Sequence, residues 1–129
     1  MGNPFVHIEL HTADISRAKD FYTQLFDWTL EEIPVPGAAP YTMIKVGEGT
    51  GGGIFETPDP TMPPHWTAYV DVDDIRSSTD KARSLGATVL QDVTQVGAYG
   101  WFSIIQDPTG AVLALWKTAD ETHPDNAAA

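Results

Sequence analysis

The stretch from Phe5 to His11 holds the residues best suited to chemistry, because two histidines and a carboxylate recur there at every second position. Alternation with period two is typical of a half-buried strand. One face of that strand would carry Phe5, His7, Glu9 and His11, and the other Val6, Ile8 and Leu10. Imidazole and carboxylate groups at this spacing can transfer protons, pair with one another or bind a metal ion. We therefore predict a functional site on the polar face.

Each of these side chains allows more than one interpretation. Glu9 could be a general base whose pKa is raised by burial, or a carboxylate paired with a nearby His or Tyr, and we favour the paired form. His11 is interpreted as a partner of Glu9 or a residue at the rim of the site. His7 is either a metal ligand or a histidine hydrogen-bonded to a neighbour. Glu9 and His11 are the catalytic candidates.

Composition and charge exclude several classes of function. The 129 residues carry a net charge of −11, from 18 acidic and 7 basic residues, which argues against binding nucleic acid or an anionic membrane. The absence of cysteine excludes disulfides and thiolate chemistry. No apolar run approaches the roughly 20 residues of a membrane helix, and no leader pattern is visible, so we expect a cytoplasmic protein.

A helix is predicted directly after the first strand. Asp14 is placed to cap it, and its apolar positions follow the spacing of an amphipathic helix: Ile15, Ala18, Phe21, Tyr22, Leu25 and Phe26. We expect this apolar stripe to pack on Val6, Ile8 and Leu10. The remaining strands of the first half are predicted at residues 28–33, 41–46 and 54–56. The glycines at 51–53 are interpreted as structural, marking a close backbone approach or a sharp bend.

The same order of elements starts again after a segment rich in proline, residues 58–64. A shift of 60 positions superposes the halves, placing Asp14 on Asp74 and Tyr41 on Trp101. A strand is predicted at 66–72, then a helix that Asp73-Asp74-Ile75 opens, that runs through Leu85 and that Gly86 stops. Further strands are predicted at 88–93, 101–106 and 111–116. We infer an α+β fold of two βαβββ modules, residues 1–57 and 65–117, within one domain of residues 1–117. Residues 118–129 are predicted to be a disordered tail.

The pattern resembles the vicinal oxygen chelate superfamily, which contains glyoxalases, bleomycin-resistance proteins and extradiol dioxygenases. The resemblance rests on features in their order along the chain: His7 seven residues before Asp14, the run from Ala18 to Tyr22, the run from Val72 to Ile75, and Asp107-Pro108-Thr109-Gly110 before the last strand. It implies that the strands of the two modules curve into a cup-shaped sheet. It also implies a ligand or metal site inside the cup.

Metal-using members of this superfamily bind a divalent ion through the first and last strands of each module. The resemblance places His7 and Glu56 at these positions in the first module, and Thr67 and Ala114 in the second. Two of the four expected ligands are therefore absent from this sequence. We predict no tightly bound cofactor or metal, while weak or substrate-dependent binding of a divalent metal stays open.

The inward face of the second module should carry further residues of a ligand pocket. With His7, the predicted lining is Thr67, Tyr69, Ala114 and Trp116. Aromatic and aliphatic walls with a few polar groups suit a small organic ligand. We predict a small-molecule binding protein, with two alternatives: a metal-dependent lyase, isomerase or dioxygenase using His7 and Glu56, and a metal-free acid–base enzyme using Glu9. A homodimer is expected, with Trp28, Trp66 and Trp101 as candidate interface or core residues.

Overall fold

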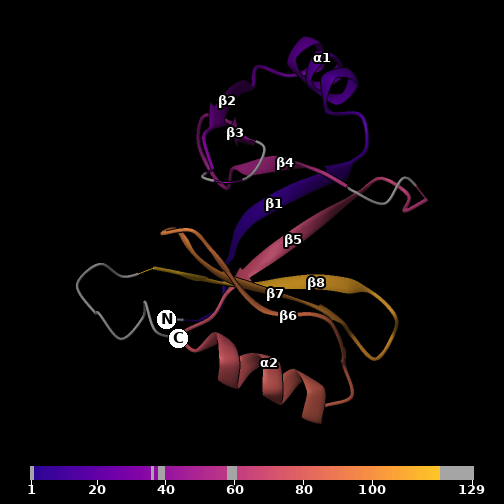
Figure 1. The fold of residues 1–129 in the computed structure, drawn as a ribbon, viewed down its shortest axis with the longest axis vertical. Coiled ribbons are helices and arrows are strands. Elements are labelled where there is room, and N and C mark those ends of the chain that lie inside the picture. Colours follow the sequence, from indigo (N-terminus) through magenta and orange to yellow (C-terminus); the bar gives the residue numbers. More distant parts are fainter. Residues whose placement is uncertain (1, 36, 38–39, 58–60, 120–129) are drawn as a thin grey trace. The chain divides into compact units, whose positions relative to one another are not determined.

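The computed structural model describes residues 2–35, 37, 40–57 and 61–119 (Figure 1). The chain divides into two compact units, a first unit of Val6–Ala68 and a second unit of Met1–Phe5 with Tyr69–Ala129. The described residues form eight strands and two helices, which confirms the predicted α+β class. Residues 58–60 of the predicted linker and 120–129 of the predicted tail lie outside the described residues. The last strand ends at Thr118, one residue inside the predicted tail.

The first half of the chain has the element order predicted for one βαβββ module. The elements are β1 (Phe5–Thr12), α1 (Ile15–Leu25), β2 (Thr29–Ile33), β3 (Tyr41–Lys45) and β4 (Gly52–Glu56). The strands lie in the order β2-β3-β4-β1. β1 pairs with β4 in parallel, whereas β3 pairs antiparallel with β2 and β4. β1 is thereby placed beside β4, with β3 one strand further.

The second half repeats these elements about 60 positions later, so the internal repeat is confirmed. The elements are β5 (His65–Asp71), α2 (Ile75–Ser84), β6 (Thr88–Val96), β7 (Gly100–Gln106) and β8 (Val112–Thr118). Their order is β5-β8-β7-β6, with β5 and β8 parallel. β6 carries register shifts between Val89 and Gln91 and between Gln91 and Thr94.

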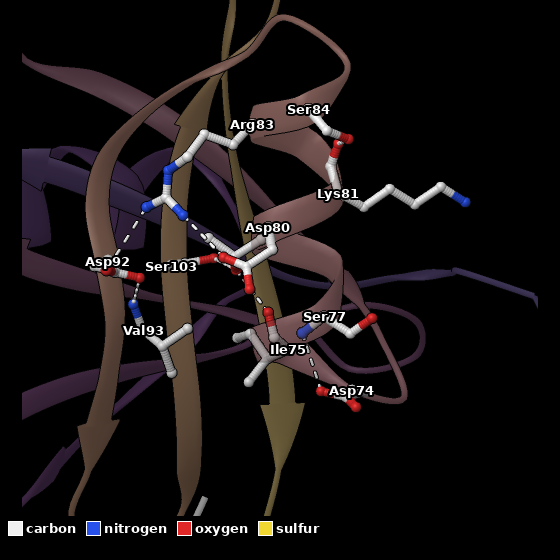
Figure 2. Close-up of polar contacts among 11 residues, drawn as sticks. Asp74, Ile75, Ser77, Asp80, Lys81, Arg83, Ser84, Asp92, Val93 and Ser103 are labelled. Carbon is white, nitrogen blue, oxygen red and sulfur yellow. Dashed lines mark hydrogen bonds and ion pairs between the residues drawn. The ribbon is translucent and has the colours of Figure 1, made fainter.

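Both helices begin at the predicted aspartate caps. The Asp14 carboxylate accepts a hydrogen bond from the Arg17 backbone N–H at 3.1 Å, and Asp74 accepts one from Ser77 at 3.1 Å (Figure 2). Such caps satisfy backbone donors that have no partner inside the helix. α2 ends before Gly86, whose φ of +105° favours glycine. No helix among the described residues is long and apolar enough to cross a membrane.

The core of the first unit is smaller than the sequence pattern suggested. Leu10, Ile44 and Ile54 are buried, and the α1 residues Ile15, Ala18 and Tyr22 pack against them. The expectation that Val6 and Ile8 also receive the helix is wrong, since they are 38% and 39% exposed. Only the end of β1 nearest the helix contributes to this core. The outer part of the α1 stripe, formed by Phe21, Leu25 and Phe26, is also exposed.

The core of the second unit is built around Trp101, which is 2% exposed. It packs with Val72, Ile75, Ile105 and Leu115. α2 is also tied to its sheet by polar contacts, because the buried Thr79 and Ser103 hydroxyls lie 2.8 Å apart. On the surface, Arg83 contacts both Asp80 and Asp92 (Figure 2). Trp101 is therefore a core residue, and the predicted interface role does not fit it.

Candidate functional site

Glu9, on the polar face of β1, lies at the centre of a cluster of ionisable side chains. Its side chain is 10% exposed. The Tyr41 hydroxyl donates a hydrogen bond to Glu9 Oε2 at 2.7 Å. His7 Nε2 lies 3.5 Å from the same oxygen, and His11 Nε2 lies 3.2 Å from Oε1. His11 Nε2 makes no hydrogen bond among the described residues, so the last contact is an electrostatic one.

The positions of the protons in this cluster follow from its donors and acceptors. Tyr41 has one hydroxyl proton, and it is donated to Glu9. The hydroxyl oxygen also lies 2.8 Å from His7 Nε2. That bond therefore requires the proton to be on His7 Nε2, which donates to Tyr41. The result is a hydrogen-bonded chain from His7 through Tyr41 to Glu9, in which Nδ1 is the atom of His7 that can exchange a proton without breaking the chain.

Tyr41 reaches Glu9 because Gly53 leaves room above the intervening strand. Glu9 and Met43 are both register partners of Gly53, so β4 lies between β1 and β3 at this level. A Cβ atom added at Gly53 would overlap the hydroxyl and ring carbons of Tyr41. The phenol thus crosses β4 over a residue that has no side chain. The structural interpretation of the glycine run is confirmed, since a Cβ at Gly52 would also overlap the Ile8 carbonyl.

The surroundings of Glu9 hold it in the charged form. Burial alone would raise its pKa, because desolvation disfavours a carboxylate. The contacts with His11, His7 and Tyr41 outweigh burial and lower the pKa from 4.5 to about 2. The hydrogen bond from Tyr41 gives Glu9 the form of a paired carboxylate, and its lowered pKa argues against the alternative of a base with a raised pKa. At neutral pH the group is an anion that accepts a hydrogen bond from Tyr41 of β3 and lies beside His7 and His11 of β1.

His11 is fixed on its other sides by rings from β4 and β5. Its imidazole stacks on His65, with ring centroids 4.9 Å apart and an interplanar angle of 12°. Phe55 lies at 5.7 Å in a tilted arrangement. His65 Nδ1 lies 2.9 Å from the Pro63 carbonyl oxygen. His11 is thus a partner of Glu9, as expected, and sits in an aromatic setting within the first unit.

Glu56 is not brought to this cluster. It is exposed at the end of β4 and is the register partner of Thr12. Residues paired across parallel strands point to the same side of a sheet, so Glu56 shares the side of Thr12 and Leu10. His7, Glu9 and His11 occupy the opposite side of β1. The structure therefore separates the two first-unit residues that the resemblance assigned to a metal.

The predicted pocket residues of the second half are only partly brought together. Tyr69 is the register partner of Ala114, so the two share a side of β5 and β8. Trp116, two residues further along β8, contacts Tyr69 edge-on at 6.5 Å. Tyr69 and Ala114 are buried. Thr67 is buried too, and it belongs to the first unit. Their role in ligand binding stays a prediction.

The residues present do not fit the metal site of metal-using relatives. Ala114 has no donor atom, Thr67 has only a neutral hydroxyl, and Glu56 lies away from His7. Glu9 already accepts a hydrogen bond from Tyr41 and lies beside the imidazoles of His7 and His11. Within the described ranges, no group of three or more His, Cys, Asp or Glu side chains is placed to hold a metal ion.

Three residues of the cluster were not identified from the sequence: Tyr41, Gly53 and His65. Tyr41 lies more than thirty residues from Glu9 in sequence, so no local pattern joins them. The glycine run at 51–53 was the available signal. It predicted that some group lies close to the backbone there, but it did not identify that group as the Tyr41 side chain. His65 had no role in the sequence analysis, and the structure stacks its ring on His11.

Comparison with known proteins shows the family to which this chain belongs. Residues 5–115 match the model of the Glyoxalase/Bleomycin resistance protein/Dioxygenase superfamily. CFP32 of Mycobacterium tuberculosis, which is named as a glyoxylase, is 38% identical over 85% of this chain and 44% of its own length. The anthracycline biosynthesis protein DnrV of Streptomyces peucetius is 29% identical over 84% of this chain and 45% of its own. The chain thus spans less than half of these relatives.

Solved structures show the same fold at low identity. Methylmalonyl-CoA epimerase from Mycobacterium tuberculosis superposes with a TM-score of 0.67 at 18% identity, covering 97% of this chain and 91% of that one. A Bacillus halodurans protein superposes with a TM-score of 0.70 at 13% identity, covering 95% and 99%. The predicted fold class is therefore confirmed as a known fold.

Proposed function

The chain belongs to the Glyoxalase/Bleomycin resistance protein/Dioxygenase superfamily, and on this basis we propose that it binds a small organic molecule on the polar face of β1. The proposed contact groups are His7, His11 and Tyr41, with Glu9 as the anion that orders them. The proposal includes no tightly bound metal. The observation that carries it is the buried, ionised Glu9, which accepts a hydrogen bond from Tyr41 of β3 and lies beside His7 and His11 of β1.

A network of this kind is not required by the fold, as the internal repeat demonstrates. Shifting by 60 positions replaces His7, Glu9 and His11 with Thr67, Tyr69 and Asp71. Tyr41 is replaced by Trp101, which fills the core of the second unit. Both halves nevertheless form the same order of elements. Buried ionisable clusters usually cost stability, so one that the fold does not need supports a role in recognition or chemistry.

The exposure of the cluster favours contact through the imidazoles. The His7 side chain is 22% exposed and that of His11 13%, whereas Glu9 is 10% exposed and already engaged by three groups. Imidazoles can donate or accept hydrogen bonds and can also contact flat apolar groups. Phe55, beside His11, adds apolar surface. These features suit an organic ligand that combines oxygen or nitrogen atoms with an apolar body.

The names of relatives agree with a small organic ligand. They include a glyoxylase, anthracycline biosynthesis proteins and, among structural neighbours, an epimerase acting on a CoA thioester by its name. Sequence identity to the epimerase is too low to transfer its reaction. The longer relatives contain more sequence than this chain, so their activities are not assigned to it. These names support only the proposal that the ligand is a small organic molecule.

A second candidate function is proton transfer by His7. The observation that favours it is the hydrogen-bonded chain from His7 through Tyr41 to Glu9. Glu9, with its pKa near 2, is a poor base at neutral pH. In this role Glu9 and Tyr41 orient the imidazole, and Nδ1 exchanges the proton with the ligand. This revises the acid–base alternative, which had Glu9 as the base.

Ligand-detected NMR with a library of small metabolites tests the binding proposal. Wild type, Glu9→Gln and Glu56→Gln are compared, since Glu56 is a carboxylate on the other side of the adjacent strand. We expect compounds that bind wild type and Glu56→Gln but lose at least about tenfold in affinity for Glu9→Gln, as expected for loss of a charged contact. Binding that is unaffected by Glu9→Gln would overturn this site. A hit that gives turnover lost in His7→Ala would favour proton transfer.

A further inference from the structure

His65, the first residue of β5, has a ring nitrogen whose purpose the fold does not explain. Its imidazole stacks on His11, with ring centroids 4.9 Å apart and an angle of 12° between the planes. Its Nδ1 lies 2.9 Å from the Pro63 carbonyl oxygen. Both contacts lie within the first unit. Among the described residues, neither a hydrogen bond nor an ion pair engages the other ring nitrogen, Nε2.

The contact with Pro63 determines which nitrogen of His65 carries the proton. A carbonyl oxygen only accepts hydrogen bonds, so the nitrogen that bonds to it must donate. The proton of the neutral imidazole is therefore on Nδ1, and the lone pair is on Nε2. It follows that His65 Nε2 is a hydrogen-bond acceptor.

The carbonyl that sets this tautomer is held by a stiff piece of backbone. Pro63 and Pro64 follow one another directly before the strand. The proline ring fixes φ, and a residue that precedes a proline is kept extended. The Pro63 carbonyl therefore has little freedom to turn away from His65. An imidazole held in this way through one nitrogen presents the other nitrogen in a fixed direction.

The ring stacked on His65 does not offer its own Nε2 in the same way. His11 Nε2 is buried without a hydrogen bond among the described residues, and it lies 3.2 Å from Glu9 Oε1. His65 is only half-buried, and its Nε2 is not among the buried side-chain atoms that lack a partner. Of these two Nε2 atoms, the one on His65 is therefore suited to contact a ligand.

The internal repeat indicates that the fold does not need an imidazole at this position. A shift of 60 positions places His65 on Phe5, which begins β1 as His65 begins β5. A phenyl ring can therefore occupy the start of this strand. Stacking on His11 does not require nitrogen either, because flat rings of any kind can stack. What the imidazole adds over a phenyl ring is its hydrogen-bonding capacity.

We infer that His65 Nε2 accepts a hydrogen bond from the ligand, and that this ligand carries an N–H or O–H donor beside a flat group. The inference rests on the proposed ligand site and deepens it by naming the class of ligand. Phe55, which is 45% exposed beside His11, provides apolar contact for the flat group. A ligand without the donor would leave the nitrogen unpaired, and such ligands bind less well.

Two matched pairs of fragments test this inference. Benzyl alcohol and benzyl methyl ether differ in a neutral O–H donor, whereas benzylamine and benzyltrimethylammonium differ in the N–H donors of a cation. Each fragment is added to nitrogen-15-labelled protein, and long-range proton–nitrogen NMR follows the imidazole nitrogens. In at least one pair the donor member should bind about three- to tenfold more tightly, the effect of one hydrogen bond. It should also shift the His65 Nε2 signal.

His65→Phe is the matched variant, because it keeps a flat ring and introduces the residue found at the equivalent position of β1. It should bind the ether and the trimethylammonium compound within about twofold of wild type, and it should lose the preference for the donor members. A purely structural role for His65 would weaken all four fragments alike. Circular dichroism checks that the variant is folded. If it is not, the tautomer and the Nε2 shift of wild type decide, since neither needs a variant.

The outcomes separate this inference from the proposed ligand site. The inference is overturned, with the site intact, if fragments shift His7 and His11 without any preference for a donor. It is also overturned if the preference survives in His65→Phe, or if His65 of the free protein is protonated on Nε2. Fragments that shift none of the three imidazoles up to about 50 mM, above the millimolar affinity expected of molecules this small, would contradict the ligand site and this inference with it.

Discussion

The Tyr41 hydroxyl lies 2.7 Å from Glu9 Oε2, having crossed β4 above Gly53 to reach it. This one contact joins three strands: β1 supplies the carboxylate, β3 the phenol, and β4 the space between them. It also passes a hydrogen bond on to His7.

The charge on Glu9 should make folding stability depend on acid. Its pKa is lowered from 4.5 to about 2 in the folded protein, so the folded state favours the ionised form. The resulting stabilisation is present above the unfolded pKa and is lost as the pH falls from about 4.5 toward 2. It is on the order of 3 kcal/mol for a shift of this size.

Urea unfolding across this acid range measures that effect. Wild type should lose stability more steeply than Glu9→Gln, which has no charge to titrate. Glu56→Gln, altered at an exposed carboxylate, should follow wild type. Parallel curves for wild type and Glu9→Gln would contradict the account of Glu9 as a buried, ionised group.

Removing the phenol oxygen should raise the pKa of Glu9. Tyr41→Phe keeps the ring but deletes the hydroxyl that donates to the carboxylate. A hydrogen bond to a charged group contributes about 1.5 to 3 kcal/mol, so we expect the pKa to rise by about one unit or more. Carbon-13 NMR of the glutamate carboxyl carbons gives the value directly. A Glu9 pKa unchanged in Tyr41→Phe would mean that His7 and His11 alone hold the charge.

Gly53→Ala should act on Glu9 through Tyr41. The added methyl group would occupy the space of the phenol, forcing it away from the carboxylate. We expect a raised Glu9 pKa, as in Tyr41→Phe, and a loss of stability of about 1 to 3 kcal/mol from overpacking. In a Tyr41→Ala background the same change should cost much less. Equal costs in both backgrounds would show that the strain arises from the backbone instead.

The repeat, the caps and the order of elements could be read from the sequence because they depend on local spacing. Asp14 and Asp74 cap the helices through residues three positions away. Tyr41 could not be found in this way, because its role depends on the register of β1, β4 and β3. Glu56 was wrongly placed on the same face of the sheet as His7. The sequence does not give the register between β1 and β4, which decides which β4 residues share a face with His7. The exposed half of the α1 stripe was also predicted to be core, because the helical spacing of its apolar residues does not show how much of the stripe the sheet covers.

Divalent metals should have little effect on this protein. Of the residues that the resemblance assigned to a metal, Ala114 has no donor atom. Glu56 points to the face of the sheet opposite to that of His7. We expect no change in melting temperature with EDTA, and no saturable stabilisation by nickel, zinc, cobalt or manganese beyond that seen in His7→Ala. One equivalent of metal per chain after gel filtration, lost in His7→Ala, would restore the metal-dependent alternative.

The most direct test of the central claim follows the imidazole signals of His7 and His11 by NMR while the best compound from the library is added. The account predicts that both rings shift together and saturate at one equivalent of compound per chain. The exposed Tyr99 ring, in the second unit, should stay unchanged as a control. Saturable binding that leaves both imidazoles unperturbed would contradict the proposal that the polar face of β1 is the ligand site.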